Sequence, residues 1–140
     1  MNRQLATQIS LTLLRTVSGL LFMQAGGLKL FGWFGGMPPN GATAPLMTQT
    51  GIGGLLELVG GALMILGLFT RVTAFIISGE MAVAYWQFHA PGGFWPIQNH
   101  GEAAVYLCFI FLFFSAFGAS DYSLDALLKR RQEKPEAAHR

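Results

Sequence analysis

Four apolar stretches, each close to the length that crosses a lipid bilayer, constrain the fold of this chain more than any other feature. They cover about residues 9–30, 52–69, 72–88 and 102–118. A transmembrane helix needs about 20 predominantly apolar residues. Charged residues make up only 11% of the sequence, whereas a soluble domain has about 25%. The sequence therefore predicts an all-α membrane protein in which residues 1–120 form a four-transmembrane-helix bundle.

Cationic residues are distributed unevenly around these stretches. If the N-terminus is cytoplasmic, Lys29 alone lies on the far side of the membrane, whereas seven cations lie on the cytoplasmic side: Arg3, Arg71, Lys129, Arg130, Arg131, Lys134 and Arg140. Cytoplasmic flanks of transmembrane helices carry an excess of Lys and Arg. The charge pattern thus predicts that both termini are cytoplasmic and that the lipid bilayer is the main partner.

Residues 121–140 form a basic cytoplasmic tail. Ser123 is a candidate N-cap, and we expect a short interfacial helix to about Arg131, followed by a disordered end. The cations suit anionic lipids or a soluble partner. Nucleic acid is not an expected partner, because the basic residues follow a long apolar run. The single cysteine, Cys108, excludes an internal disulfide, a CxxC redox pair and a cysteine-rich metal site.

Several ionisable residues lie inside the apolar stretches or at their edges. A charge at mid-bilayer costs about 2.5–3.5 kcal/mol, so such groups are expected to face one another. Arg15 and Glu80 lie at similar heights, roughly 9 Å and 12 Å above the inner ends of their helices at 1.5 Å per residue, which predicts a buried ion pair between them. Lys29, Glu57 and Glu102 are expected to form a second cluster near the outer rim. Alternatively, these charges only fix helix register.

The segment from His89 to Glu102 is rich in aromatic, glycine and proline residues and is expected to form a shaped loop. Next to the outer charges, it predicts a ligand pocket with aromatic walls; the alternative is a lid anchored in the membrane interface. The candidate ligand-binding residues are Lys29, Glu57, Trp95, Asn99, His100, Glu102 and Tyr106. No metal site is predicted, because the spacing of the histidines and Glu102 matches no metal motif.

Motifs along the chain fall in a characteristic order. They are Arg15-x3-Gly19, Gly26-x2-Lys29, Glu57-x2-Gly60-Gly61-x5-Gly67-x3-Arg71, Glu80, His89-x4-Phe94-Trp95-Pro96-x2-Asn99-x-Gly101-Glu102 and Ser123-Leu124-Asp125. From about residue 13 to 125 this pattern resembles the DoxX family of small four-helix bacterial membrane proteins. The resemblance implies a multi-pass protein of the bacterial inner (plasma) membrane, linked to respiratory or redox-defence chemistry, since related subunits are associated with quinol oxidase and with thiosulfate:quinone oxidoreductase.

Three functions remain open at this stage. The first is a membrane subunit that binds a quinone or another lipophilic molecule near the outer leaflet. It is not expected to be a complete enzyme by itself, because the sequence contains no evident cofactor motif. The second is a scaffold that forms homo-oligomers through a helix face bearing Gly53, Gly60 and Gly67 and recruits redox-complex subunits through its tail. The third is a small proton-coupled transporter, for which intramembrane carboxylates are typical.

Overall fold

The chain is built from helices, as seen in a computed structural model that describes residues 2–137. The α-helices are α1 (Arg3–Phe31), α2 (Gln49–Leu66), α3 (Thr70–Ala84), α4 (Pro96–Asn99), α5 (Glu102–Phe117) and α6 (Leu124–Ala137). Shorter turns are η1 (Trp33–Gly35), the π-helical η2 (Tyr85–His89) and η3 (Ala90–Gly92). Within residues 2–137 the only β-type pairing is an isolated bridge between Met37 and Ala42. The predicted all-α class is confirmed.

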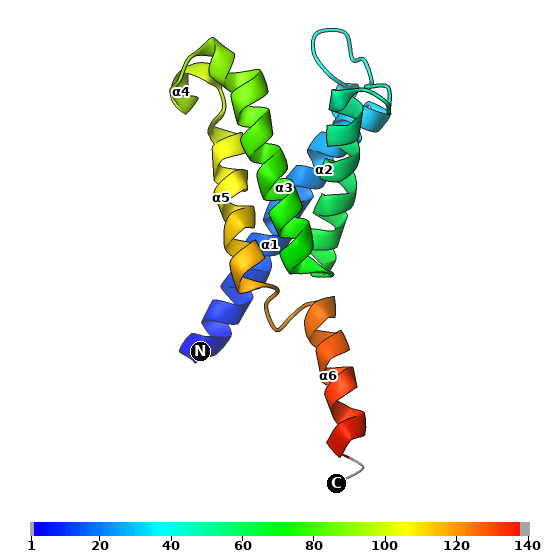
Figure 1. The fold of residues 1–140 in the computed structure, drawn as a ribbon, viewed down its shortest axis with the longest axis vertical. Helices are drawn as coiled ribbons and strands as arrows, with labels where there is room; N and C mark the ends of the chain where they lie inside the picture. The colour runs from blue at the N-terminus through cyan, green and yellow to red at the C-terminus, as the bar shows by residue number, and fades with distance from the viewer. Residues whose placement is uncertain (1, 138–140) are drawn as a thin grey trace.

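The four long helices of the bundle form two antiparallel pairs. α1 packs mainly on α2, and α3 packs mainly on α5. Figure 1 shows that α2, α3 and α5 converge near the turn between α2 and α3 and separate toward the opposite end. The start of α1 and the whole of α6 lie at the convergent end. The two chain ends thus leave the bundle at the same end, although the side of a bilayer on which this end lies stays a prediction.

Two of the helices are long and apolar enough to cross a membrane. They are α1, with 29 residues, and α2, with 18 residues, while α5 is apolar but shorter. α3 has 15 residues and continues directly into η2. α1 begins earlier than expected, at Arg3, because the Asn2 side chain accepts a hydrogen bond from Gln4 N at 3.2 Å and caps the helix. The four predicted stretches therefore coincide with helices, whereas four membrane crossings stay a prediction.

Glycine residues bring α1 and α2 into close contact. A Cβ atom at Gly26 would lie 2.4 Å from Leu58 N, and one at Gly19 would lie 2.8 Å from Gly61 O. Such contacts let helix backbones approach where lipid provides no hydrophobic drive. The glycines predicted to mediate oligomerisation also face neighbours within the chain: Gly53 faces Glu80, Gly60 faces Ile77 and Gly67 faces Arg15. These glycines thus have packing neighbours within the chain, and homo-oligomerisation stays a prediction.

The two helix pairs share a small apolar core. Phe22 of α1 meets Phe111 of α5 edge to face, with ring centroids 5.0 Å apart. Met64, Ile77 and Phe114 are buried beside them. Burying aromatic and aliphatic side chains between the pairs holds them together over the middle of the bundle. The same cluster includes Met81 and Ala104, which also line the cavity described next.

The tail is more helical than the sequence suggested. Ser123 acts as the predicted N-cap, since its Oγ accepts a hydrogen bond from Ala126 N at 3.2 Å. α6 then continues to Ala137, so the expectation of a disordered segment directly after Arg131 is corrected for residues 132–137. Gln132, Glu133 and Lys134 are strong helix formers and favour this extension, whereas Pro135, near the end of α6, does not. Residues 138–140, for which disorder was also predicted, lie outside the described residues.

Candidate functional site

A cavity of about 710 Å³ lies between the two helix pairs, at the end of the bundle away from α6. This volume is within the range of about 300–1,000 Å³ that is typical of small-molecule sites. Its apolar walls come from α1, α2, α3, η2 and α5: Ala25, Ile52, Gly53, Leu56, Ile76, Met81, Val83, Ala84, Phe88, Ala103, Ala104 and Leu107. Its polar lining residues are Lys29, Gln49, Thr50, Glu57, Glu80 and His89.

An ion pair between α1 and α2 forms the polar centre of the cavity. Lys29 Nζ lies 2.5 Å from Glu57 Oε1, and this is the only ion pair among the residues that the structure describes. The Glu57 side chain is 4% exposed, whereas that of Lys29 is 29% exposed. Gly54 permits this approach, since a Cβ atom there would lie 3.1 Å from Lys29 Cβ. The close α1–α2 contact thus places a charge pair in an apolar wall.

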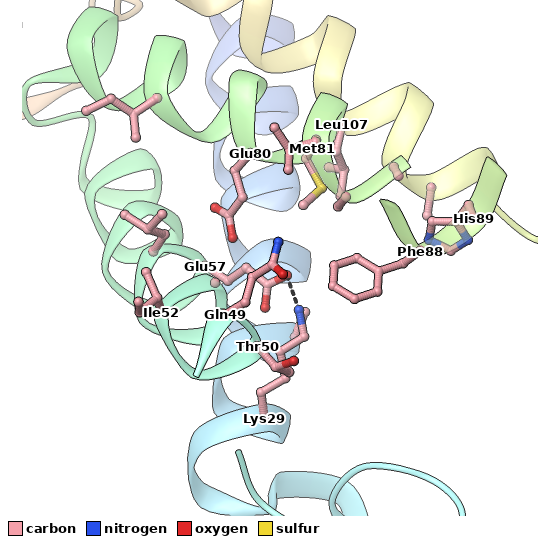
Figure 2. Close-up of a pocket in the computed structure, with 18 residues that line it drawn as sticks. Lys29, Gln49, Thr50, Ile52, Glu57, Glu80, Met81, Phe88, His89 and Leu107 are labelled. Atoms are coloured by element: carbon pink, nitrogen blue, oxygen red, sulfur yellow. Dashed lines mark hydrogen bonds and ion pairs between the residues drawn. The ribbon is translucent and has the colours of Figure 1, made fainter. Parts of the chain in front are cut away.

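Glu80 of α3 completes the charged group from the other side of the cavity. Figure 2 shows its carboxylate directed toward Glu57, and the charges of both Glu57 and Lys29 act on it. Gly53 leaves room for it, because a Cβ atom at that position would lie 3.2 Å from Glu80 Oε1. Both Glu57 Oε2 and Glu80 Oε2 are buried and have no hydrogen-bond partner among the described residues. These two oxygens are covered by protein atoms, so they belong to the wall of the cavity and are not exposed to its open space.

The π-helical turn η2 brings two further side chains to the cavity. Phe88 and His89 both line it, and π-helical turns are frequent at functional sites. His89 Nδ1 lies 3.1 Å from Asn99 O. Because a carbonyl oxygen only accepts, Nδ1 carries the proton of this hydrogen bond. At the mouth, Gln49 Nε2 donates a hydrogen bond to Gln87 Oε1, so a polar contact connects α2 with η2.

Asn99, a predicted ligand-binding residue, holds the loop between α3 and α5 in place. Its Nδ2 donates to Gly93 O at 2.6 Å, and its Oδ1 accepts from Gly101 N at 2.8 Å. Tyr85 OH lies 3.3 Å from Asn99 Nδ2 and also donates to Phe94 O. These bonds use the amide within the loop, so Asn99 shapes the region beside His89 and does not line the cavity.

The other predicted ligand residues fall into two groups. Lys29 and Glu57 line the cavity, whereas Trp95, His100, Glu102 and Tyr106 do not. Trp95 and Tyr106 are 62% and 70% exposed. On α5 the cavity is lined by Ala103, Ala104 and Leu107. Glu102 and Tyr106 lie on a different face of this helix. The expected cluster of Lys29, Glu57 and Glu102 is thus corrected: Glu80, and not Glu102, is its third member.

The predicted ion pair between Arg15 and Glu80 is also corrected, because these residues lie at opposite ends of α2. A Cβ atom at Gly67 would lie 2.8 Å from Arg15 Nη1, whereas Gly53 faces Glu80. Fourteen residues along α2 correspond to about 20 Å at 1.5 Å per residue. The sequence estimate failed because it set the inner ends of the two helices at the same level. In the structure the end of α2 lies beside Arg15, which is twelve residues into α1, so the start of α1 extends beyond the ends of α2 and α3.

Arg15 instead hydrogen-bonds to main-chain carbonyls at the convergent end of the bundle. Its Nη1 donates to Met64 O and, at 2.9 Å, to Ile65 O, and its Nη2 donates to Tyr122 O at 2.9 Å. Arg15 is 1% exposed, and the charge of Asp125 acts on it. These bonds connect α1 to the last residues of α2 and to the segment that leads into α6.

Asp125 completes this connection by capping α3. Its two carboxylate oxygens accept hydrogen bonds from Phe69 N and Thr70 N at 2.8 Å and 2.9 Å. Its own N donates to Gly67 O at 2.9 Å. We refer to Arg15, Asp125 and their main-chain partners as the Arg15–Asp125 junction. It accounts for the occurrence of Arg15 and Ser123-Leu124-Asp125 among the motifs noted in the sequence.

Sequence analysis missed several residues of the cavity. Glu80 was noticed but assigned to the wrong partner, although Glu80, Ala84 and Phe88 recur at a four-residue spacing that places them on one side of a helix. All three line the cavity. No spacing pattern in the sequence identifies Gln49 as a cavity residue, since its position depends on where α2 begins. His89 was considered only as a metal ligand; in the part of the chain that the structure describes, no group of three His, Cys, Asp or Glu side chains is placed to hold a metal ion.

Fold and site together define an all-helical, strongly apolar protein whose helices enclose a cavity with a charged centre. The profile of the DoxX family matches residues 10–90, which include Lys29, Glu57 and Glu80. The chain therefore belongs to the DoxX family, whose members are membrane-associated. An uncharacterized protein of Haemophilus influenzae is 41% identical over 119 residues, covering 82% of this chain and 87% of the relative. No solved structure matches the chain significantly.

Proposed function

We propose that this protein is a multi-pass subunit of the bacterial inner membrane that binds a quinone, or another lipophilic molecule of similar size, in the cavity between its helix pairs. The observation that carries the proposal is the apolar cavity with the Lys29–Glu57 ion pair and Glu80 at its centre. Apolar pockets with a few convergent polar groups are typical ligand sites. Ionisable residues inside membrane segments also tend to be functional.

The polarity of the cavity matches a molecule with a polar ring and an apolar tail. Ile52, Leu56 and Leu107 give it apolar walls suited to a ring and tail. An ammonium group has three N–H donors, and one of those of Lys29 is used by Glu57. The remaining donors are available to a ring oxygen. A bound quinone would supply the redox chemistry, while Lys29, Glu57 and Glu80 would bind and orient its ring.

The position of the cavity supports a site near the outer leaflet. It lies at the end of the bundle away from α6, and the charge pattern predicts that the termini are cytoplasmic. Trp33, Phe34, Phe94 and Trp95 lie on the loops next to this end and are exposed. Aromatic side chains of this kind are enriched at membrane interfaces. A lipophilic ligand would thus reach the site from the bilayer.

The test fills the cavity without disturbing the bundle elsewhere. Gly53→Leu places a side chain in the cavity wall beside Glu80, whereas the matched control Gly79→Leu lies on α3 where a Cβ atom meets nothing within 4 Å. Membranes containing each variant are solubilised, and quinones that remain with the purified protein are quantified by mass spectrometry. We expect Gly53→Leu to lose at least about 90% of the retained quinone, which corresponds to a tenfold loss of affinity. Equal retention by both variants would overturn the proposed site.

A further inference from the structure

We propose that one face of α6 binds anionic phospholipids at the convergent end of the bundle, with leucine side chains toward the acyl chains and arginine side chains on the phosphate groups. This surface lies at the opposite end from the cavity and is independent of the quinone ligand. α6 joins the bundle at its first turn, where Asp125 bonds to Phe69 N and Thr70 N. Among the residues that the structure describes, α6 packs closely on no other helix, and Figure 1 shows that it extends away from the bundle. Its later turns are therefore open to whatever surrounds the protein.

Leucine and arginine side chains share one face of α6. Leu127, Arg130 and Arg131 follow one another at three- and four-residue spacing, and Leu128 lies three residues before Arg131. Residues at these spacings lie on one side of a helix. All four are exposed, Leu127 by 51% and Leu128 by 46%. A helix face that combines exposed leucines with cations is typical of helices that bind at a membrane surface.

The opposite face of α6 carries the acidic residues among its described side chains. Asp125, Lys129 and Glu133 recur every four residues and so share this face. Lys129 stands one turn before Glu133, a spacing at which opposite charges attract. Among the described side chains, the positive charge of Arg130 and Arg131 is thus not offset on their own face. This face is complementary to the negative charge of anionic lipid headgroups.

The height of this face along the bundle favours lipid over a soluble partner. Because Asp125 caps α3, it lies level with the turn between α2 and α3. α2 has 18 residues, or about 27 Å at 1.5 Å per residue, close to the ~30 Å of a hydrocarbon core. With α2 across a bilayer, this turn marks the edge of the core. Leu127 and Leu128 then lie about 3–5 Å beyond Asp125, and Arg130 and Arg131 about 8–9 Å. The headgroup layer is about 5–8 Å thick, so the leucines lie within it and the long arginine side chains reach its phosphate groups.

The experiment measures lipid binding to the full-length protein in detergent micelles by native mass spectrometry, which also reports the oligomeric state. The probes are dioleoyl phosphatidylglycerol, which is anionic, and dioleoyl phosphatidylcholine, which has the same acyl chains and no net charge. We expect the wild type to bind the first phosphatidylglycerol at least about tenfold more tightly than the first phosphatidylcholine. In the double variant Arg130→Gln/Arg131→Gln this preference should fall below about threefold, because each cation near an anionic lipid contributes about fivefold.

A matched pair of single variants tests which face binds. Arg131→Gln and Lys129→Gln remove the same charge from opposite faces of one helix, and both side chains are exposed. We expect Arg131→Gln to lose about fivefold in affinity for phosphatidylglycerol and Lys129→Gln to lose less than about twofold. Leu128→Ser should weaken both lipids to the same extent, since their acyl chains are identical. Far-ultraviolet circular dichroism checks that each variant retains its helices.

Four results would overturn the proposal. Equal affinity of the wild type for the two lipids would leave the arginines to a soluble acidic partner. A wild-type dimer that Arg130→Gln/Arg131→Gln no longer forms would assign the face to a second copy of the chain. Equal losses in Arg131→Gln and Lys129→Gln would show that binding does not depend on the leucine-bearing face. Displacement of phosphatidylglycerol by an equal concentration of glycerol 3-phosphate would show that a free phosphate, and not a lipid, is bound.

Discussion

The Arg15–Asp125 junction and the cavity around Lys29, Glu57 and Glu80 both bury charged groups in an apolar bundle, but they differ in what satisfies those groups. At the junction, the guanidinium and carboxylate groups bond to main-chain carbonyl and N–H groups of three segments. In the cavity, one oxygen each of Glu57 and Glu80 remains without a partner among the described residues; at the junction, Arg15 Nε does so too, but both terminal nitrogens of its guanidinium are bonded. The difference separates a charge that connects three segments of the fold from charges for which we propose a role in binding.

The presence of a charge in an apolar stretch therefore gives no guide to its role. Arg15 and Glu80 both appeared in the sequence as intramembrane charges of similar depth. Arg15 has main-chain partners supplied by α2 and by the segment before α6. The Glu80 carboxylate points toward Glu57, and its Oε2 has no hydrogen-bond partner among the described residues. Because an unpaired buried charge is unfavourable unless something binds to it, residues of the two regions should respond in opposite ways to neutralising substitutions.

The largest expected effect tests the structural role of the junction. Arg15→Met keeps an apolar side chain of similar length but removes the donor to the carbonyls of Met64, Ile65 and Tyr122; of these, Met64 O still accepts from Gly67 N. We expect the free energy of unfolding to fall by about 3 kcal/mol, measured by SDS-induced unfolding in mixed micelles. The control Arg71→Met removes an exposed cation whose side chain donates to Ser115 O. This variant should change the free energy of unfolding by less than about 0.5 kcal/mol. Equal losses of unfolding free energy in Arg15→Met and Arg71→Met would show that the junction does not depend on Arg15.

A smaller loss is expected on removing the cap of α3. Asp125→Ala leaves Phe69 N and Thr70 N without an acceptor, and the loss of a helix cap typically costs about 1–2 kcal/mol. Asp125→Asn retains one acceptor oxygen and should cost about half as much. The same unfolding measurement checks both variants. If Asp125→Ala unfolds like the wild type, α6 does not contribute to the junction.

The smallest expected effect has the opposite sign. Glu80→Met replaces a carboxylate that lacks a partner with an apolar side chain of similar size, so we expect the free energy of unfolding to rise by about 1 kcal/mol. Quinone retention should fall in the same variant. Glu102→Gln, outside the cavity, should change neither quantity. A clear loss of stability in Glu80→Met would mean that Glu80 supports the fold, and the comparison between the two regions would then fail.

The sequence predicted the helical part of this protein well because helix formation here follows from local composition. Apolar runs of helix length, the N-cap at Ser123 and the glycines that permit close packing are all visible in the order of residues. Helix ends were less predictable. Asn2 extends α1 to Arg3 by a single side-chain hydrogen bond, and η2 has no periodicity signal that distinguishes it from the end of α3.

The sequence also identified the charged residues that matter, since every ionisable group in an apolar stretch is unfavourable without a partner. It grouped Lys29 with Glu57, as the structure has them, but it paired Glu80 with Arg15. Only the packing of the two helix pairs placed Glu80 beside Glu57. Arg15 instead meets main-chain carbonyls about 20 Å away along α2. Composition determined which groups need partners, and tertiary structure decided which of them received one, because hydrogen bonds act over a few ångströms and depend on how helices pack.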